Sequence, residues 1–130
     1  MRILFSLLAV ALAGSAVAAD RAPRQTDEQR LAAALNGLVP DRPMDCLDSR
    51  QSSQIEAYGP VILYRVSKNL IYRNDTGGGC EHIANGDILV TTSISGRLCR
   101  GDIGRTVSPS PRFQTGSCSL GSFTAYRRPK

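Results

Sequence analysis

Four cysteines are the residues whose type and spacing point most directly to chemistry. Cys46, Cys80, Cys99 and Cys118 include no Cys-x-x-Cys pair, and the single histidine, His82, follows Cys80 at a spacing that matches no zinc motif. We therefore expect no metal site and no cofactor. An even number of cysteines in an exported chain is typical of disulfides, so we predict two bridges, each stabilising by roughly 3–4 kcal/mol.

The order of turns and strands favours one pairing of these cysteines. Cys99 follows a turn at Ser95-Gly96, whereas Cys80 lies well before the strand that precedes this turn. A bridge between the two would join different levels of one hairpin, which the short reach of a disulfide disfavours. We favour Cys46 with Cys99 and Cys80 with Cys118, and the sequence leaves the other two connectivities open.

Hydrolytic chemistry has few candidate residues. His82 has Asp75, Glu81 and Asp87 near it in the sequence, but there is no Gly-x-Ser-x-Gly elbow and no motif of paired carboxylates. Cysteines held in disulfides do not act as nucleophiles. We therefore predict no catalytic residue, and keep an exported hydrolase that uses Asp/Glu or His82 as the alternative.

Charge is distributed unevenly along the chain. Residues 97–130 carry seven basic residues and one acid, whereas residues 20–96 carry eight basic residues and ten acids. Arginine pairs well with carboxylates and phosphates, so an anionic envelope component or an acidic protein is the expected partner, and nucleic acid is not. The candidate anion-binding residues are Arg97, Arg100, Arg105, Arg127 and Arg128.

The first 19 residues predict export. A positive start is followed by an apolar run at residues 3–13 and by small residues that end at Ala18 and Ala19. This run is shorter than the ~20 residues that span a bilayer, so we interpret residues 1–19 as a signal peptide that is cleaved near Ala19. The mature protein is then periplasmic or secreted and has no transmembrane segment.

Residues 20–44 are expected to form a short N-terminal helix and a linker. Thr26 and Gln29 have the spacing of a capping box, and leucines and alanines recur at helical spacing from Leu31 to Leu38. Two prolines within residues 39–43 prevent the helix from continuing. Whether the helix docks on the rest of the protein is left open by the sequence.

Residues 45–128 are expected to form a disulfide-stabilised β domain. Apolar and polar residues alternate in short segments that are separated by Gly, Pro and Asn turns. This pattern predicts a mainly β fold, a small antiparallel barrel or sandwich of five to six strands. The expected strands are residues 53–58, 61–66, 70–73, 88–94, 98–99 extended through 103–107, and 123–126.

Several phrases of this domain resemble a known family. They are Cys46-Leu47-Asp48, Ile62-Leu63-Tyr64-Arg65-Val66, Tyr72-Arg73-Asn74, Cys80, Leu98-Cys99-Arg100-Gly101-Asp102-Ile103, and residues 116–123 around Cys118. Over residues 45–128 the chain resembles a family of small exported proteobacterial proteins classed as a domain of unknown function. The resemblance implies a secreted, four-cysteine, mostly β domain, and implies no activity, ligand or catalytic residue.

Length and composition limit the function further. The chain has 130 residues, is 42% hydrophobic and carries a formal net charge of +5, which fits one globular domain and excludes a multidomain enzyme or a membrane channel. We expect an exported, non-enzymatic module, either an envelope-associated binding protein or an inhibitor of a hydrolase.

Overall fold

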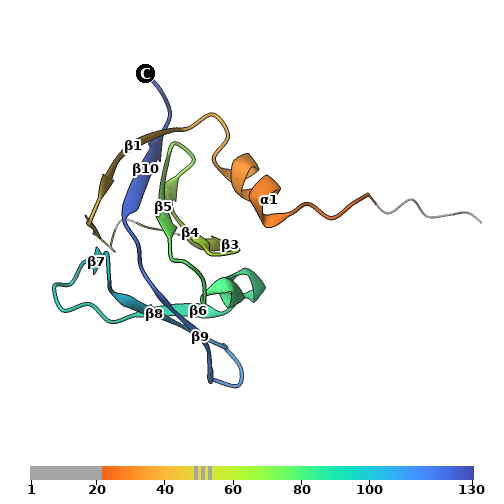
Figure 1. Cartoon of the computed structure of the whole chain (residues 1–130), viewed down its shortest axis with the longest axis vertical. Helices are drawn as coiled ribbons and strands as arrows, with labels where there is room; N and C mark the ends of the chain where they lie inside the picture. Colours follow the sequence, from red (N-terminus) through yellow and green to blue (C-terminus); the bar gives the residue numbers. More distant parts are fainter. Residues whose placement is uncertain (1–21, 49, 51, 53) are drawn as a thin grey trace, which may run out of the picture.

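The protein is mainly β, with one α-helix and two disulfides (Figure 1). The computed structural model describes residues 22–48, 50, 52 and 54–130, so the predicted signal peptide lies outside the described residues. The described part holds ten strands in three antiparallel sheets, of five, three and two strands, rather than the five to six strands expected. Within these residues, no helix is long and apolar enough to cross a membrane.

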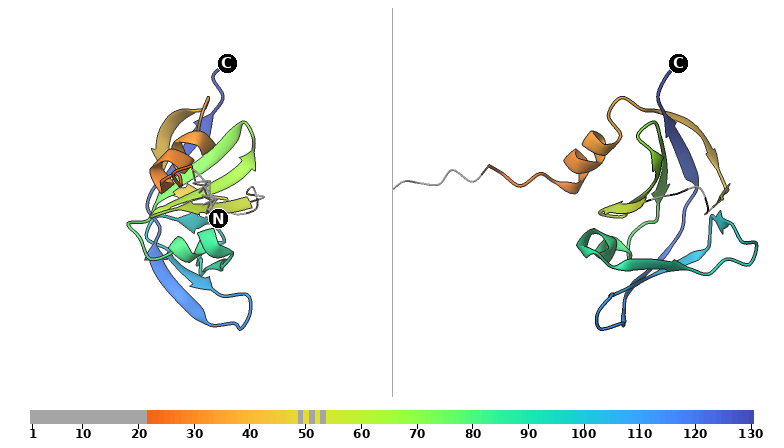
Figure 2. Two further views of the ribbon diagram at one scale, coloured as in Figure 1. Left: turned by 90° about the vertical axis from the view of Figure 1, so that its right-hand side faces the viewer. Right: turned by 180° about the vertical axis from the view of Figure 1, so that it is seen from behind.

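Helix α1 (Asp27–Ala34) begins where the capping box predicted. The Gln29 amide donates to Thr26 Oγ1 at 3.2 Å, and the Thr26 amide donates to Gln29 Oε1 at 2.9 Å. The helix starts at Asp27, inside the chain. It is therefore not N-terminal, contrary to the expectation for residues 20–44. The helix docks: Leu31 and Leu35 pack on the outer face of the five-stranded sheet, the side away from the three-stranded sheet (Figure 2).

The five-stranded sheet has the order β1-β10-β5-β4-β3. Its strands are β1 (Val39–Met44), β3 (Gln54–Tyr58), β4 (Val61–Ser67), β5 (Leu70–Asp75) and β10 (Phe123–Arg127). Strand β4 is buried on both faces, because α1 covers Val61 and Leu63 while Ile62 and Tyr64 face the main core. Sheet and helix together therefore bury two separate apolar clusters.

The segment expected to be a linker forms strand β1 instead. Its prolines, Pro40 and Pro43, lie in an edge strand that pairs only with β10. Proline has no backbone N–H to donate, and an edge strand tolerates this because one of its sides has no partner strand. Residues 39–44, which were expected to be a linker, therefore form a strand of the five-stranded sheet.

The three-stranded sheet has the order β6-β8-β9, with β6 (Ile88–Thr91), β8 (Ile103–Val107) and β9 (Gln114–Ser119). Strand β9 was missed because its small and polar residues show no apolar alternation. The short strands β2 (Cys46–Leu47) and β7 (Leu98–Cys99) form a separate ribbon. Strand β7 does not continue into β8 as expected, because the chain turns between them, with the Asp102 amide donating to the Cys99 carbonyl at 3.0 Å.

The sheets do not close into a barrel. Strands β3 and β6 are each the last strand of a sheet, and neither pairs with the other. Between the two larger sheets lies the main core, which is centred on Tyr64, Phe123, Leu120 and the Cys80–Cys118 bridge. This arrangement leaves a hollow between β3 and β6, to one side of the core.

Candidate functional site

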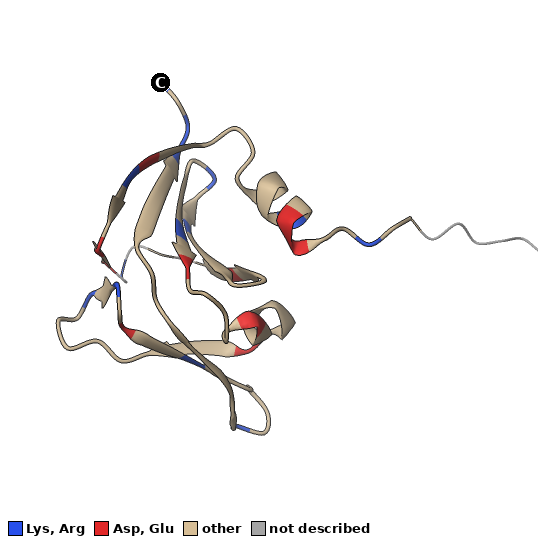
Figure 3. Ribbon diagram, viewed as in Figure 1, with Lys and Arg blue, Asp and Glu red and all other residues tan. Residues whose placement is uncertain are grey.

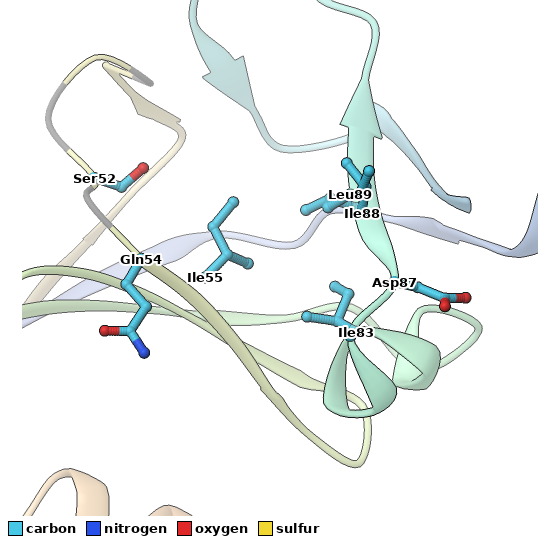
Figure 4. Close-up of a pocket in the computed structure, with 8 residues that line it drawn as sticks. Ser52, Gln54, Ile55, Ile83, Asp87, Ile88 and Leu89 are labelled. Atoms are coloured by element: carbon cyan, nitrogen blue, oxygen red, sulfur yellow. The ribbon is translucent and has the colours of Figure 1, made fainter. Parts of the chain in front are cut away.

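A groove lies between the unpaired edges of β3 and β6 (Figure 4). It consists of two adjoining cavities of about 430 and 370 Å³, which share Ser52, Ile55 and Leu89 in their lining. Pockets of this size are typical of small-molecule sites. The larger cavity reaches the 3-10 helix η2 (Glu81–Asn85), and the smaller one reaches Tyr64 and Leu98.

Apolar side chains from three elements face this groove. Ile55 of β3, Ile83 of η2 and Leu89 of β6 point toward one another across it (Figure 4). Strand alternation explains Ile55, because Gln54 and Glu56 on either side of it face the opposite way. Ile55 is 37% exposed, although it stands next to the buried core residue Ala57 on the same face. The groove is therefore an opening toward the apolar interior.

The groove contains almost no charge. Among the described residues that line it, Asp87 is the only charged one, and its side chain points away from Ile55 and Leu89 (Figure 4). The Asp87 carboxylate accepts a hydrogen bond from Thr115 Oγ1, which lies 2.8 Å from the buried Thr106 Oγ1. Asp87 is thus held by β9 and is not directed at a ligand.

Tyr64 lines the smaller cavity and has an unusual hydroxyl. The residue is fully buried, and its ring packs edge-on against Phe123 with 5.7 Å between the ring centroids. Within the described part of the chain, its hydroxyl is the one buried side-chain polar atom without a hydrogen-bond partner. Burial raises the pKa of this hydroxyl far above its ordinary value, so the group stays protonated.

The opposite face of β3 is polar. Arg65 Nε lies 3.2 Å from Glu56 Oε1, and the Tyr58 hydroxyl donates to Glu56 Oε2 at 2.8 Å. Burial raises the pKa of Glu56, but the hydrogen bonds from Arg65 and Tyr58 outweigh it, so that this pKa lies below its usual value. The pair joins the edge strand β3 to β4 and takes no part in the groove.

The residues considered for hydrolysis do not come together. His82 lies exposed on η2, while each nearby carboxylate is bonded to a group other than the imidazole. Glu81 accepts the Gly79 amide at 3.0 Å, Asp75 pairs with Arg73 at 2.9 Å, and Asp87 accepts from Thr115. Among the described residues, His82 is therefore not paired with any of the three carboxylates near it in the sequence.

The candidate anion-binding arginines are distributed over separate elements. Arg97 and Arg100 flank β7, Arg105 lies on β8, and Arg127 and Arg128 lie at the end of β10. Figure 3 shows basic positions near the C-terminus, beside β7 and on β8, rather than in one cluster. Arg127 Nε lies 3.8 Å from Asp41 Oδ2. The structure does not gather these five arginines into one site.

The disulfides join Cys46 to Cys99 and Cys80 to Cys118, which is the pairing that the sequence favoured. Cys46 and Cys99 stand directly opposite each other in the β2–β7 ribbon. The second bridge lies in the core, and Gly104 of β8 packs against both of its sulfur atoms.

The groove itself was not anticipated from the sequence. Ile55 and Leu89 each fit an ordinary strand pattern, and only the tertiary arrangement shows that neither β3 nor β6 pairs with another strand on that side. Tyr64 falls in the predicted strand 61–66, and the missing partner of its hydroxyl left no signal in the sequence.

Comparison of the chain with protein-family models, with curated proteins and with solved structures finds no match.

Proposed function

We propose that this protein is an exported, non-enzymatic binding module whose ligand site is the groove between β3 and β6. Residues 1–19 would direct it to the periplasm or the medium and be removed near Ala19. The two disulfides agree with such a location. N-terminal sequencing of exported material tests the cleavage, with Ala19 or Asp20 as the expected first residue.

The observation that supports binding most strongly is a cavity beside the core that is lined by apolar and polar residues in about equal measure. A protein of this size gains stability by filling such a space with its own side chains, because interiors are close-packed. Here Ile55 and Leu89 remain partly exposed, with a cavity of about 370 Å³ between them and Tyr64. A pre-formed hollow that offers both apolar surface and polar groups is the usual form of a ligand site.

The hydrolase alternative has weaker support from the geometry. A general base must lie within hydrogen-bond reach of the group that it activates. The carboxylates near His82 are bonded elsewhere, and His82 is not among the residues that line the groove.

Binding can be tested with N-phenyl-1-naphthylamine, an uncharged fluorophore that brightens in apolar surroundings. We expect saturable binding to the wild-type protein and at least about a tenfold loss in Ile55→Glu, because that change places a carboxylate in the groove. The matched control is Ile103→Glu on β8, where the isoleucine is 47% exposed and lies outside both cavities. Absence of saturable binding to the wild type, or equal loss in both variants, would refute the proposal.

A further inference from the structure

We infer that the groove binds an extended, uncharged peptide segment of a partner protein, which adds as a strand to the free edge of β6. The inference rests on the proposed function and names the class of ligand. An unpaired strand edge presents backbone N–H and C=O groups in a row, and proteins commonly recognise extended peptides by pairing with such an edge. The observation that carries the inference is a groove that runs along the unpaired edge of β6.

The residues that line the groove show that it follows strand edges and not the faces of the sheets. Ile88 and Leu89, which are successive residues of β6, both line the larger cavity (Figure 4). On the opposite wall Gln54 and Ile55, successive residues of β3, do the same. Successive side chains of a strand point to opposite faces, so a cavity that meets both of them lies beside the edge.

The backbone of β6 is paired on one side only. Its ladder with β8 runs from Ile88 opposite Val107 to Thr91 opposite Gly104. In an antiparallel ladder every second residue bonds the neighbouring strand, and the residues between direct their N–H and C=O groups to the other side. Among the described residues, no backbone–backbone hydrogen bond beyond this ladder is formed by residues 88–91. These outward groups are therefore available to an added strand.

The other strands that end the two larger sheets are protected against such pairing. Strand β1 contains Pro40 and Pro43, and β3 carries the charged residue Glu56. The backbone of β9 is covered by the segment after β5, since a Cβ atom on Gly116 would overlap the carbonyl oxygen of Gly79. Prolines, charges and covering segments are the usual means by which sheet edges avoid pairing with another chain.

Strand β6 has none of these protections. Residues 88–96 contain no charged residue and no proline. Ile88 and Val90 are each 48% exposed, on the face of β6 away from Leu89. An uncharged edge with exposed β-branched side chains favours the addition of another extended chain.

The lining of the groove suits a peptide segment. A peptide offers backbone donors and acceptors to the polar side chains and its own side chains to the apolar ones. The two cavities, of about 430 and 370 Å³, have room for a segment and not for a second folded domain. The polar side chains are Ser52, Gln54 and Ser93, and the apolar ones that face the groove are Ile55, Ile83 and Leu89.

The segment is assigned no charge because the groove offers no counterion. Among the described residues that line the two cavities there is no Lys, Arg or His. The one carboxylate, Asp87, accepts from Thr115 and points away from the groove (Figure 4). A charged side chain placed here would lose its hydration without compensation.

The first test selects ligands from a phage-displayed library of random peptides of about 12 residues on the disulfide-intact protein. We expect the enriched sequences to share an uncharged run with apolar residues at every second position. A synthetic peptide of that sequence should bind Ile55→Glu at least about tenfold more weakly than it binds the wild type. The matched control is Ile103→Glu on β8, which should leave the affinity unchanged because Ile103 lies outside both cavities.

Backbone pairing is tested by N-methylation of the peptide amides, one at a time. A methyl group on an amide that faces β6 removes a donor and blocks the approach of the strand, whereas one on the next amide faces away. We therefore expect losses of at least about tenfold at alternate positions only. A peptide held by its side chains alone would show no such alternation, and this result would overturn strand addition.

Amide exchange identifies the strand of the protein that is involved. Peptide binding should slow the exchange of every second amide in residues 88–91. The control is β1, which also ends a sheet but contributes no residue to either cavity, and its amides should exchange as before. Slower exchange in β1 to the same extent, or unchanged exchange in β6, would overturn the assignment to β6.

The outcomes separate the two proposals. If the fluorophore binds but the library yields no peptide that is sensitive to Ile55→Glu, the ligand class is wrong while the groove remains a binding site. If the protein sediments as a dimer that Val90→Lys dissociates, a second copy of the chain occupies the edge, and the inference is overturned. If the fluorophore does not bind the wild type, the proposed function fails, and the inference fails with it.

Discussion

The two larger sheets meet at two places that are built in opposite ways. At one, which we call the sealed junction, Gly79 and Cys80 lie against Gly116 and Cys118 of β9, and the Cys80–Cys118 bridge joins them. At the other, the groove, β3 and β6 present unpaired edges with partly exposed isoleucines between them. The segment that follows β5 is therefore joined covalently to β9 on one side, while β3 and β6 are left unpaired on the other.

Backbone contact explains why the sealed junction admits no ligand. A Cβ atom on Gly116 would overlap the carbonyl oxygen of Gly79, and one on Gly79 would overlap the carbonyl oxygen of Ser117. Nearby, Asn74 Nδ2 donates to the Gly121 carbonyl at 2.8 Å, and the Gly121 amide donates to Asn74 Oδ1 at 2.9 Å. Both polar atoms of the Asn74 side chain therefore have hydrogen-bond partners within the protein, whereas the Tyr64 hydroxyl has none.

This difference indicates where stability and where binding reside. We expect the sealed junction to hold β9 against the segment after β5 whether or not the groove is filled. An opening can then be kept at the second meeting point, where Tyr64 remains without a partner. The following predictions test this division, beginning with the largest expected effect.

Removal of the buried disulfide should produce the largest loss of stability. Cys80→Ala combined with Cys118→Ala opens a bridge across a sequence separation of 38, which should lower the free energy of unfolding by about 4 kcal/mol. Because Cys80 and Cys118 are only 2% and 5% exposed, lost packing should add to this value. Denaturation by guanidinium measures the loss.

The matched control is Cys46→Ala combined with Cys99→Ala. This bridge spans a longer separation, 53, so loop closure alone would make its removal at least as costly. We expect the smaller loss, because both of these cysteines lie in the partly exposed β2–β7 ribbon. The reverse ranking would contradict the idea that the sealed junction holds the sheets together.

A methyl group at the sealed junction should have the next largest effect. Gly116→Ala places a Cβ against the Gly79 carbonyl and 2.8 Å from Thr106 Oγ1, so the backbone must shift, at a cost of about 3 kcal/mol. Gly37→Ala is the control: its Cβ meets nothing within 4 Å and suffers only the strain of φ +78, about 1 kcal/mol. Equal losses in urea denaturation would show that the contact at Gly116 is not tight.

Local patterns in the sequence predict individual elements such as α1 and β4, but they do not predict the groove. Alternation predicted the strand at residues 61–66 and the capping box predicted the start of α1, because both signals involve residues close in sequence. Strand β9 and the groove have no such signal. They arise from which strand edges meet, and this is decided by contacts between distant segments such as Gly79 with Gly116.

Removal of the orphaned hydroxyl should stabilise the unliganded protein. In Tyr64→Phe a buried group without a partner is lost, so we expect a gain of about 1 kcal/mol in the free energy of unfolding. The same chemical change at Tyr58, whose hydroxyl donates to Glu56 at 2.8 Å, should have the opposite sign and cost about 1 kcal/mol. A loss of stability in Tyr64→Phe would mean that the hydroxyl is satisfied in the folded protein.

Low pH should destabilise β3, at the groove, before it destabilises β9, at the sealed junction. Of the four predictions, this one has the smallest expected effect. The pKa of Glu56 is lowered in the folded protein, so its ionised form stabilises the fold above the unfolded value of 4.5, and this contribution is lost as the pH falls through the lower folded value. For a pair at 20–26% side-chain exposure we expect less than about 1 kcal/mol. Amide exchange of β3 should accelerate below that pH while exchange of β9 does not, because β9 is anchored by Cys118. Glu56→Gln should remove the pH dependence in β3. If β3 and β9 lose protection together in the wild type, the two sides unfold as one unit and the division between them does not extend to their stability.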